Sequence, residues 1–129
     1  MSNTGIGKSV RRVEDFRFLT GSGQFVADIS RPGQCHAVFV RSPHAHAVIK
    51  KVDTEAAAKA PGVLGIFTGQ QLAADKIGGL VCGWMIHSKD GSPMKAGVYR
   101  ALATDKVRHV GDRIAVVIAE TLDQARDAV

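Results

Sequence analysis

Three segments of the chain show the apolar patterns of β-strands, and they define the expected core. Residues 35–41 (CHAVFVR) place apolar side chains on both faces, which predicts a strand covered on both sides, with Cys35 buried. Residues 45–53 (AHAVIKKVD) alternate between two faces and carry lysines only towards the far end, where the strand would reach solvent. Residues 114–119 (IAVVIA) are apolar throughout, as in a buried strand. We expect these three strands to pack together.

Helix and turn signals predict shorter elements between these strands. Thr54 is placed to cap a helix over residues 55–60, which Pro61-Gly62 ends. Thr121 and Gln124 form the Thr-x-x-Gln pattern of a capping box, so a last helix is expected to follow Thr121. The other expected elements are short strands at 24–27, 63–68 and 105–108 and a brief helical turn at 69–75.

Composition along the chain separates an arm from one domain. Residues 1–22 are polar and interrupted by glycine, so we expect an extended arm followed by a folded domain over residues 23–129. Within that domain, residues 76–99 contain five glycines and no periodic pattern, which predicts an irregular insert. The last predicted helix is still in progress at Val129, which indicates a piece of a longer polypeptide. The expected class is α+β, with short strands in a small mixed sheet and short helices.

Charge and cysteine content limit which binding partners and which cellular compartment the sequence supports. Seventeen Lys and Arg against twelve Asp and Glu give a net charge of +5, which favours an anionic partner. The basic residues are scattered, however, and aromatic residues are only 5% of the chain, so nucleic-acid binding has no support. Two distant cysteines match no metal-site spacing and favour a reduced, cytoplasmic protein over a disulfide-rich secreted one. No segment is long and apolar enough to predict a membrane span.

Two glycine patterns imitate phosphate- or nucleotide-binding motifs. Residues 5–9 (GIGKS) match the end of a phosphate-binding loop, but position 2 is serine where the motif opens with glycine, and no strand precedes it. Gly21-x-Gly23 lacks both a preceding strand and the third glycine of a dinucleotide fingerprint. Both patterns are therefore interpreted as loop sequence.

His44 and His46 are the strongest candidates for chemistry, since residues two apart in a strand face the same way. His36 is the nearest third ligand if its strand pairs with theirs, but no histidine helix or carboxylate cluster supports a metal site. We favour a structural role, in which half-buried histidines fix the bend after Pro43 and their replacement lowers stability. The acids that flank the predicted elements are interpreted as caps or solvated side chains: Asp105, Asp112, Glu120 and Asp123. No catalytic, cofactor-binding or metal residue is assigned.

Short motifs in one consistent order cover nearly the whole chain except residues 76–99. They are RVEDxRFLTGxGxFVxDI at 12–29, FVRSPHAHAxI at 39–49, APGV at 60–63, FTG at 67–69, LAxDKVRxVGD at 102–112 and AVVIAE at 115–120. With these motifs the chain resembles the opening of the large, molybdenum-binding subunit of aerobic carbon monoxide dehydrogenases and related molybdenum hydroxylases, including xanthine dehydrogenase and aldehyde oxidase.

The resemblance implies the α/β hammerhead domain that begins these subunits. It also implies that the intact enzyme is an oxidoreductase that uses water-derived oxygen on molybdenum held by molybdopterin cytosine dinucleotide. Electrons would pass through [2Fe-2S] clusters to FAD on partner subunits. By the same resemblance, the cofactor and catalytic residues lie elsewhere, the fragment alone is inert and serves assembly, and His44 and His46 belong to a strand-turn-strand scaffold. Two alternatives remain open: a stand-alone basic binding module, and a small enzyme that uses the histidines.

Overall fold

The computed structural model describes Gly5, Gly7 and residues 9–129, so Ile6 and Lys8 of the phosphate-loop imitation, and most of the first nine residues, lie outside the described part. The chain separates into two units, Met1–Pro32 and Gly33–Val129, and each is considered by itself. In the first unit, helix α1 (Asp15–Leu19) and the 3₁₀ turn η1 (Val26–Asp28) are the regular elements. The rings of Phe18 and Phe25 stack with centroids 5.6 Å apart.

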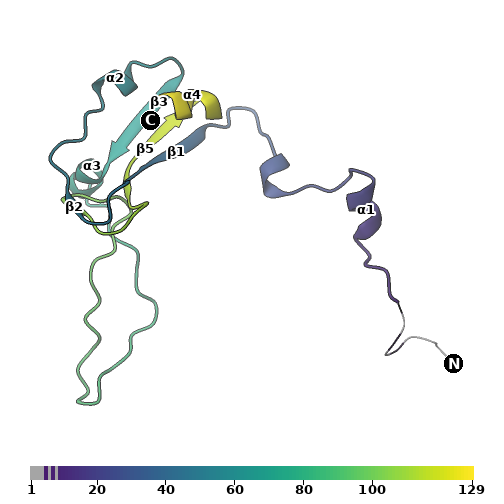
Figure 1. Ribbon diagram of the computed structural model, residues 1–129, viewed down its shortest axis with the longest axis horizontal. Coiled ribbons are helices and arrows are strands. Elements are labelled where there is room, and N and C mark those ends of the chain that lie inside the picture. The colour runs from purple at the N-terminus through teal and green to yellow at the C-terminus, as the bar shows by residue number, and fades with distance from the viewer. Residues whose placement is uncertain (1–4, 6, 8) are drawn as a thin grey trace. The chain divides into compact units, whose positions relative to one another are not determined.

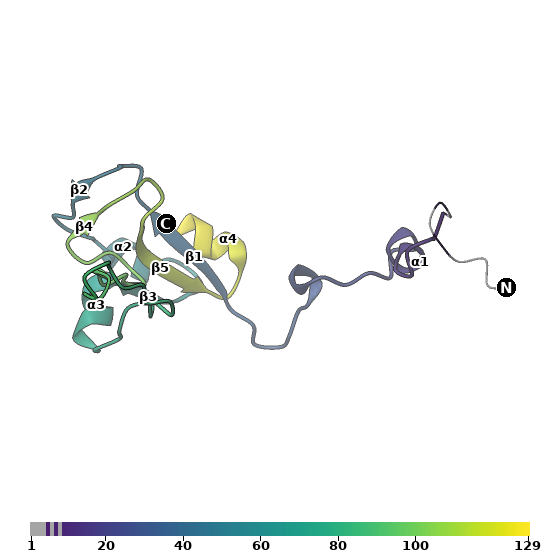
Figure 2. The ribbon, with the colours of Figure 1, turned by 90° about the horizontal axis from the view of Figure 1, so that it is seen from below.

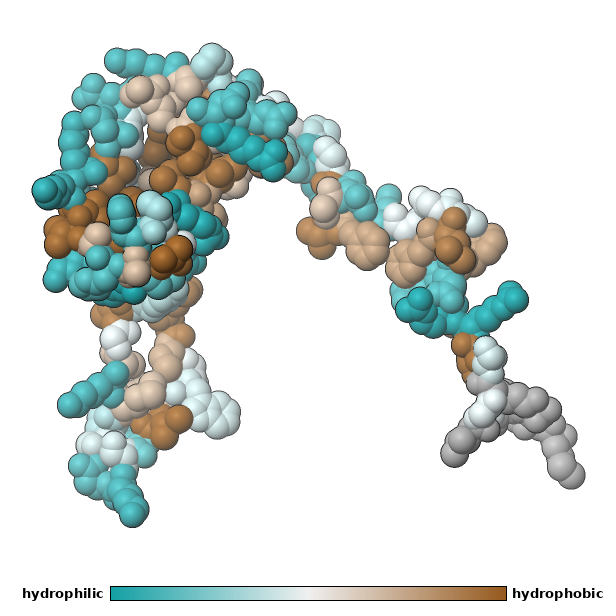
Figure 3. Space-filling view, viewed as in Figure 1, coloured by the Kyte–Doolittle hydropathy of each residue, from teal (hydrophilic) through white to brown (hydrophobic). Residues whose placement is uncertain are grey.

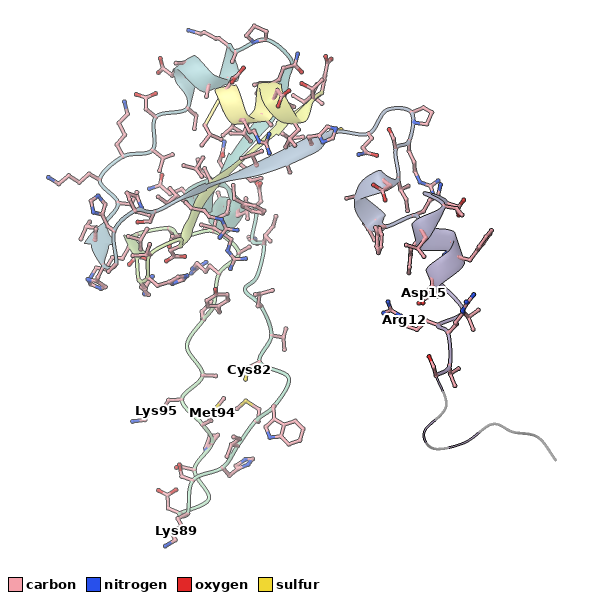
Figure 4. The ribbon with its side chains drawn as sticks, turned by 45° about the vertical axis from the view of Figure 1, so that its right-hand side comes forward. Arg12, Asp15, Cys82, Lys89, Met94 and Lys95 are labelled. Atoms are coloured by element: carbon pink, nitrogen blue, oxygen red, sulfur yellow. The ribbon has the colours of Figure 1, made fainter. Side chains whose placement is uncertain are left out.

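Two expectations about this first unit are wrong. Residues 15–19 form α1 instead of extended chain, because oppositely charged side chains three apart favour a helical turn. Arg12 Nε lies 3.0 Å from Asp15 Oδ1 (Figure 4), and Arg17 Nη2 lies 2.8 Å from Glu14 Oε1. Residues 24–27 form no strand, because the Asp28 carboxylate accepts the backbone N–H of Phe25 at 2.9 Å and closes the η1 turn.

The second unit is built on a three-stranded antiparallel sheet. Strand β5 (Arg113–Ala119) lies in the centre, between β1 (His36–Arg41) and β3 (Val63–Thr68) (Figure 1). A second, two-stranded antiparallel sheet pairs β2 (Ala47–Val48) with β4 (Lys106–Val107) (Figure 2). The fold class is therefore confirmed as α+β, although the strands pair antiparallel where a mixed sheet was expected.

Three short helices flank the larger sheet and complete the core. Helix α4 (Leu122–Asp127) packs against β1 and β5, while α2 (Glu55–Ala58) and α3 (Gly69–Ala74) contact β3. The face of β5 beneath α4 carries Ala115, Val117 and Ala119, all at most 2% exposed, and the buried Ala125 comes from α4 itself. Leu102 and Val107 extend the core.

The strand predictions over 35–41, 63–68, 105–108 and 114–119 are confirmed, and so is the helical turn at 69–75. The strand predicted over 45–53 is too long, since only Ala47 and Val48 are paired as strand and Ile49 adds one bond, from its N–H to the Asp105 carbonyl. Cys35 is exposed, because β1 begins only at His36, and the strand alternates between half-buried and exposed positions. It is therefore covered on one side within this chain.

The long loop over residues 76–99 leaves the second unit as two legs joined at a tip (Figure 1). Its only described pairings with β-geometry are isolated bridges between Leu80 and Tyr99 and between His87 and Pro93, which agrees with the predicted irregular insert. Cys82 and Met94 lie on opposite legs and Lys89 at the tip (Figure 4). Apolar side chains are exposed along it, with Val81 92% and Trp84 80% exposed.

Candidate functional site

The turn after β1 is held by Ser42, which is 3% exposed. Its hydroxyl accepts the backbone N–H of His44 at 3.0 Å and lies within donating distance, 3.0 Å, of the His44 carbonyl. Its own backbone N–H donates to the Asp112 carbonyl at 2.9 Å, and its carbonyl accepts from the Gly111 N–H at 2.8 Å. One buried serine therefore joins this turn to the turn over residues 109–112.

His44 and His46 do not have the half-buried position expected of them. Both side chains are exposed, and no hydrogen bond from either imidazole occurs among the described residues. His36 lies at the opposite end of β1, paired with Ala119, so the three histidines are not brought together. Within the described part of the chain, no group of three or more His, Cys, Asp or Glu side chains could hold a metal ion. The bend that the histidines were expected to fix is held by Ser42.

The turn over residues 109–112 completes this junction between turns. Gly111 adopts a left-handed conformation with φ of 85°, which is accessible to glycine without strain. The Asp112 carboxylate accepts the backbone N–H of Arg108 at 2.9 Å, and Arg41 Nη1 donates to the Gly111 carbonyl at 3.0 Å. Asp112 thus acts as a local cap, as its position in the sequence indicated.

A cavity of about 100 Å³ lies beside this junction, lined by residues that include Tyr99, Arg100, Arg108, His109 and Asp112. Asp105 also lines this cavity, and its pKa is shifted. Desolvation acts to raise the pKa of Asp105, but the nearby Arg108 charge, backbone N–H groups and the Thr104 hydroxyl outweigh it, so the pKa lies below its ordinary value. An acid stabilised in its charged form at neutral pH is poorly suited to proton transfer.

The other sequence candidates occupy separate places. Gly21 and Gly23 follow α1, not a strand, and Gly23 lies against the Phe18 ring. Cys35 and Cys82 are free, exposed thiols. Glu120 follows β5, and its backbone N–H donates to the Gly62 carbonyl at 2.9 Å. Asp123 lies in the first turn of α4, 3.5 Å from Arg126.

One surface was missed by the sequence analysis, which expected β1 to be covered on both sides. The face of the larger sheet away from α4 exposes Phe39 and Phe67, 41% and 43% exposed. Figure 3 shows apolar atoms reaching the surface over the strands of the second unit. The signal was present in the apolar residues on both faces of residues 35–41 and 114–119, but the sequence does not say what covers the second face.

Comparison with known proteins identifies the family to which this fold belongs. The family model described as "Aldehyde oxidase and xanthine dehydrogenase, a/b hammerhead domain" matches residues 20–129. The nicotine 6-hydroxylase large subunit of Paenarthrobacter nicotinovorans is 41% identical over 123 residues, which are 95% of this chain and 14% of that protein. The carbon monoxide dehydrogenase large chain of Afipia carboxidovorans is 38% identical over 126 residues, 97% of this chain and 14% of that one.

Solved structures agree with these sequence relatives. Quinoline 2-oxidoreductase from Pseudomonas putida 86 superposes with a TM-score of 0.81 at 34% identity, over 95% of this chain and 15% of that one. Cu,Mo-CO dehydrogenase superposes with a TM-score of 0.73 at 35% identity, over 96% and 14% of the two chains. The chain thus spans about one seventh of the length of these relatives. It belongs to the aldehyde oxidase and xanthine dehydrogenase a/b hammerhead family.

Proposed function

We propose that this chain is the hammerhead domain of the large subunit of a molybdenum hydroxylase, and that its own role is structural. The observation that carries the proposal is the family match over residues 20–129, combined with relatives of which the chain spans 14%. Those relatives are large subunits of oxidoreductases by name. The domain would fold as one layer of such a subunit and support its assembly.

On this proposal none of the described residues holds the molybdenum cofactor, since its metal would be held by the pterin and not by a cluster of protein side chains. No reaction step is therefore assigned to them. In the intact enzyme, molybdopterin cytosine dinucleotide would supply the molybdenum that oxidises substrate with water-derived oxygen. The iron–sulfur and flavin subunits would then receive the electrons. Catalytic and cofactor-binding residues belong, on this proposal, to other parts of the large subunit.

Substrate choice is assigned to those other parts as well. The named relatives include a nicotine hydroxylase at 41% identity and a carbon monoxide dehydrogenase chain at 38%, so this domain matches proteins of both kinds closely. Enzymes with such different substrates share this domain, so the domain does not determine which substrate is used. We propose an intact enzyme with chemistry like that of carbon monoxide dehydrogenase, whose substrate is selected by residues outside this chain.

The location and partners follow from the same proposal. We propose a cytoplasmic enzyme in which the remainder of the large subunit and the iron–sulfur and flavin subunits are the partners of this domain. In the described part of the chain, no helix has the length and apolar character needed to cross a membrane. A stand-alone basic module is disfavoured, because several basic side chains are neutralised locally by acids, as in the pairs of Arg12, Arg17, Lys51, Arg108 and Arg126.

Metal analysis tests this proposal. The 129-residue chain and the full coding sequence that contains it are expressed in a host that makes the molybdenum cofactor, the latter with its partner subunits. We expect molybdenum near one per large subunit in the complex and none above background in the 129-residue chain, because the residues that bind the pterin cofactor lie, on this proposal, in other parts of the large subunit. Stoichiometric molybdenum in the short chain would overturn the structural role. A complex without molybdenum would overturn the assignment to this class of enzyme.

A further inference from the structure

We propose that the uncovered face of the larger sheet is the docking surface for the remainder of its own large-subunit polypeptide. The inference rests on the proposed function above. It assigns that assembly role to one surface of the domain, called here the open face: Ala37, Phe39, Gly65, Phe67, Val116 and Ile118.

The strand register places these six positions in two rows across the three strands. Phe39 and Phe67 both pair with Val116 of the central strand, and Ala37 and Gly65 both pair with Ile118. Because side chains in a strand alternate between faces, all six lie on one side of the sheet. Gly65 has no side chain, and a Cβ built there would touch the Phe67 ring at 3.5 Å, which places that ring over the glycine on this side.

The two faces of the sheet are equally apolar but unequally covered. Val38 and Val117, opposite each other on the α4 side, belong to the covered face, and Val117 is 1% exposed. Phe39 and Phe67 on the open face are more than two-fifths exposed. A sheet with two apolar faces is stable when a layer covers each of them, as in folds where strands read as continuous apolar runs. This chain supplies one such layer.

The occupant that fits is chain from the same subunit. Curated relatives have about seven times the length of this chain, which is 14% of each, so most of the subunit is available to form the second layer. Covalent connection gives that layer a high effective concentration at the open face. No acidic or basic side chain occurs among the six positions, so an apolar layer can cover them without burying an unpaired charge. Arg41 lies at the rim, with its guanidinium carbon 5.8 Å from the centre of the Phe39 ring.

Cysteine accessibility in the full-length large subunit tests the docking directly. Phe67→Cys and, in a separate protein, Phe39→Cys report on the open face, and Lys59→Cys provides a control at an exposed position just after α2. Each full-length protein is treated with a maleimide, natively and in denaturant, and modification of the relevant peptide is followed by mass spectrometry. We expect native modification at positions 67 and 39 to be at least ten-fold slower than at position 59, relative to the denatured rates. The second open-face variant keeps the test valid if one substitution prevents folding.

The outcomes separate this proposal from its rivals and from the proposed function. Protection in the large subunit alone, unchanged by dilution, supports docking of its own chain. Docking of its own chain is contradicted if the cysteines at positions 67 and 39 are protected from maleimide only when the partner subunits are present. It is also contradicted if their protection weakens on dilution, because a second copy would then cover the face. Native modification rates at positions 67 and 39 that equal the rate at position 59 contradict it as well. If the intact enzyme binds molybdenum while these cysteines react freely, docking fails and the proposed function stands, whereas a complex without molybdenum removes the proposed function itself.

Discussion

At the scale of single residues, the conspicuous side chains are not the ones that the fold uses most. His44 and His46 attract interest because paired histidines bind metals, yet both are exposed. Ser42 beside them is 3% exposed and joins two turns through its hydroxyl and backbone. Sequence reasoning located this bend correctly but assigned its support to the wrong residues, because burial at a turn depends on a second turn 70 residues away.

Replacing Ser42 by alanine is expected to lower the free energy of unfolding by about 1–3 kcal/mol, since the backbone N–H of His44 loses its buried acceptor. The matched control is the double variant His44→Ala/His46→Ala, expected within about 0.5 kcal/mol of the parent because both side chains are exposed. Urea unfolding of the three proteins measures both. A destabilising double variant beside a neutral Ser42→Ala would return the structural role to the histidines.

At the scale of elements, the sequence correctly predicted features that a few neighbouring residues determine, such as a helix cap. The Thr121–Gln124 capping box is present, with the Thr121 hydroxyl accepting the Gln124 N–H at 3.2 Å. A second box, Thr68 with Gln71, has the same chemistry. The strand over 45–53 was overestimated because a strand needs a partner of matching length, and β4 offers only Lys106 and Val107. Pairing partners are set by the tertiary fold, so alternation alone could not fix that length.

The threonine caps give a prediction with an internal control. Thr68→Ala and Thr121→Ala should each lower the free energy of unfolding by about 1 kcal/mol, because each removes a hydroxyl that accepts a helical N–H. Thr54 stands at the start of α2 but makes no such bond, since Asp53 Oδ1 accepts the Glu55 N–H instead. Thr54→Ala should therefore change stability by a few tenths of a kcal/mol or less. Thermal and urea unfolding compare the three, and equal losses at all positions would contradict the capping account.

At the scale of the whole chain, sequence motifs identified the family and the α+β class, and the family match over residues 20–129 confirms both. The open face was harder to foresee. Apolar residues on both sides of residues 35–41 predict burial of both faces, but a sequence does not show which face its own helices cover. The register resolves this, because α4 packs against β1 and β5 over Ala115, Val117 and Ala119. The wrong assignment of the bend to the histidines has the same origin, because Ser42 supports it through a contact with a distant turn that no local pattern encodes.

Hydrogen exchange should show how stability is distributed through the second unit. In β5 the backbone N–H groups are paired on both sides, and in the edge strands β1 and β3 those that face β5 are paired. These paired amides lie above a buried layer and should exchange slowest, through global unfolding. Residues 78–97 have side chains that are exposed apart from the half-buried Met94, and they make a few isolated hydrogen bonds. Their ordering entropy is therefore poorly offset, and exchange should be rapid. Residues 45–53, which sequence analysis grouped with the core strands, should exchange rapidly except near Ala47–Ile49. Peptide-resolved exchange on the 129-residue chain measures all three regions. Protection of residues 78–97 equal to that of β5 would show that the long loop has a packed structure of its own.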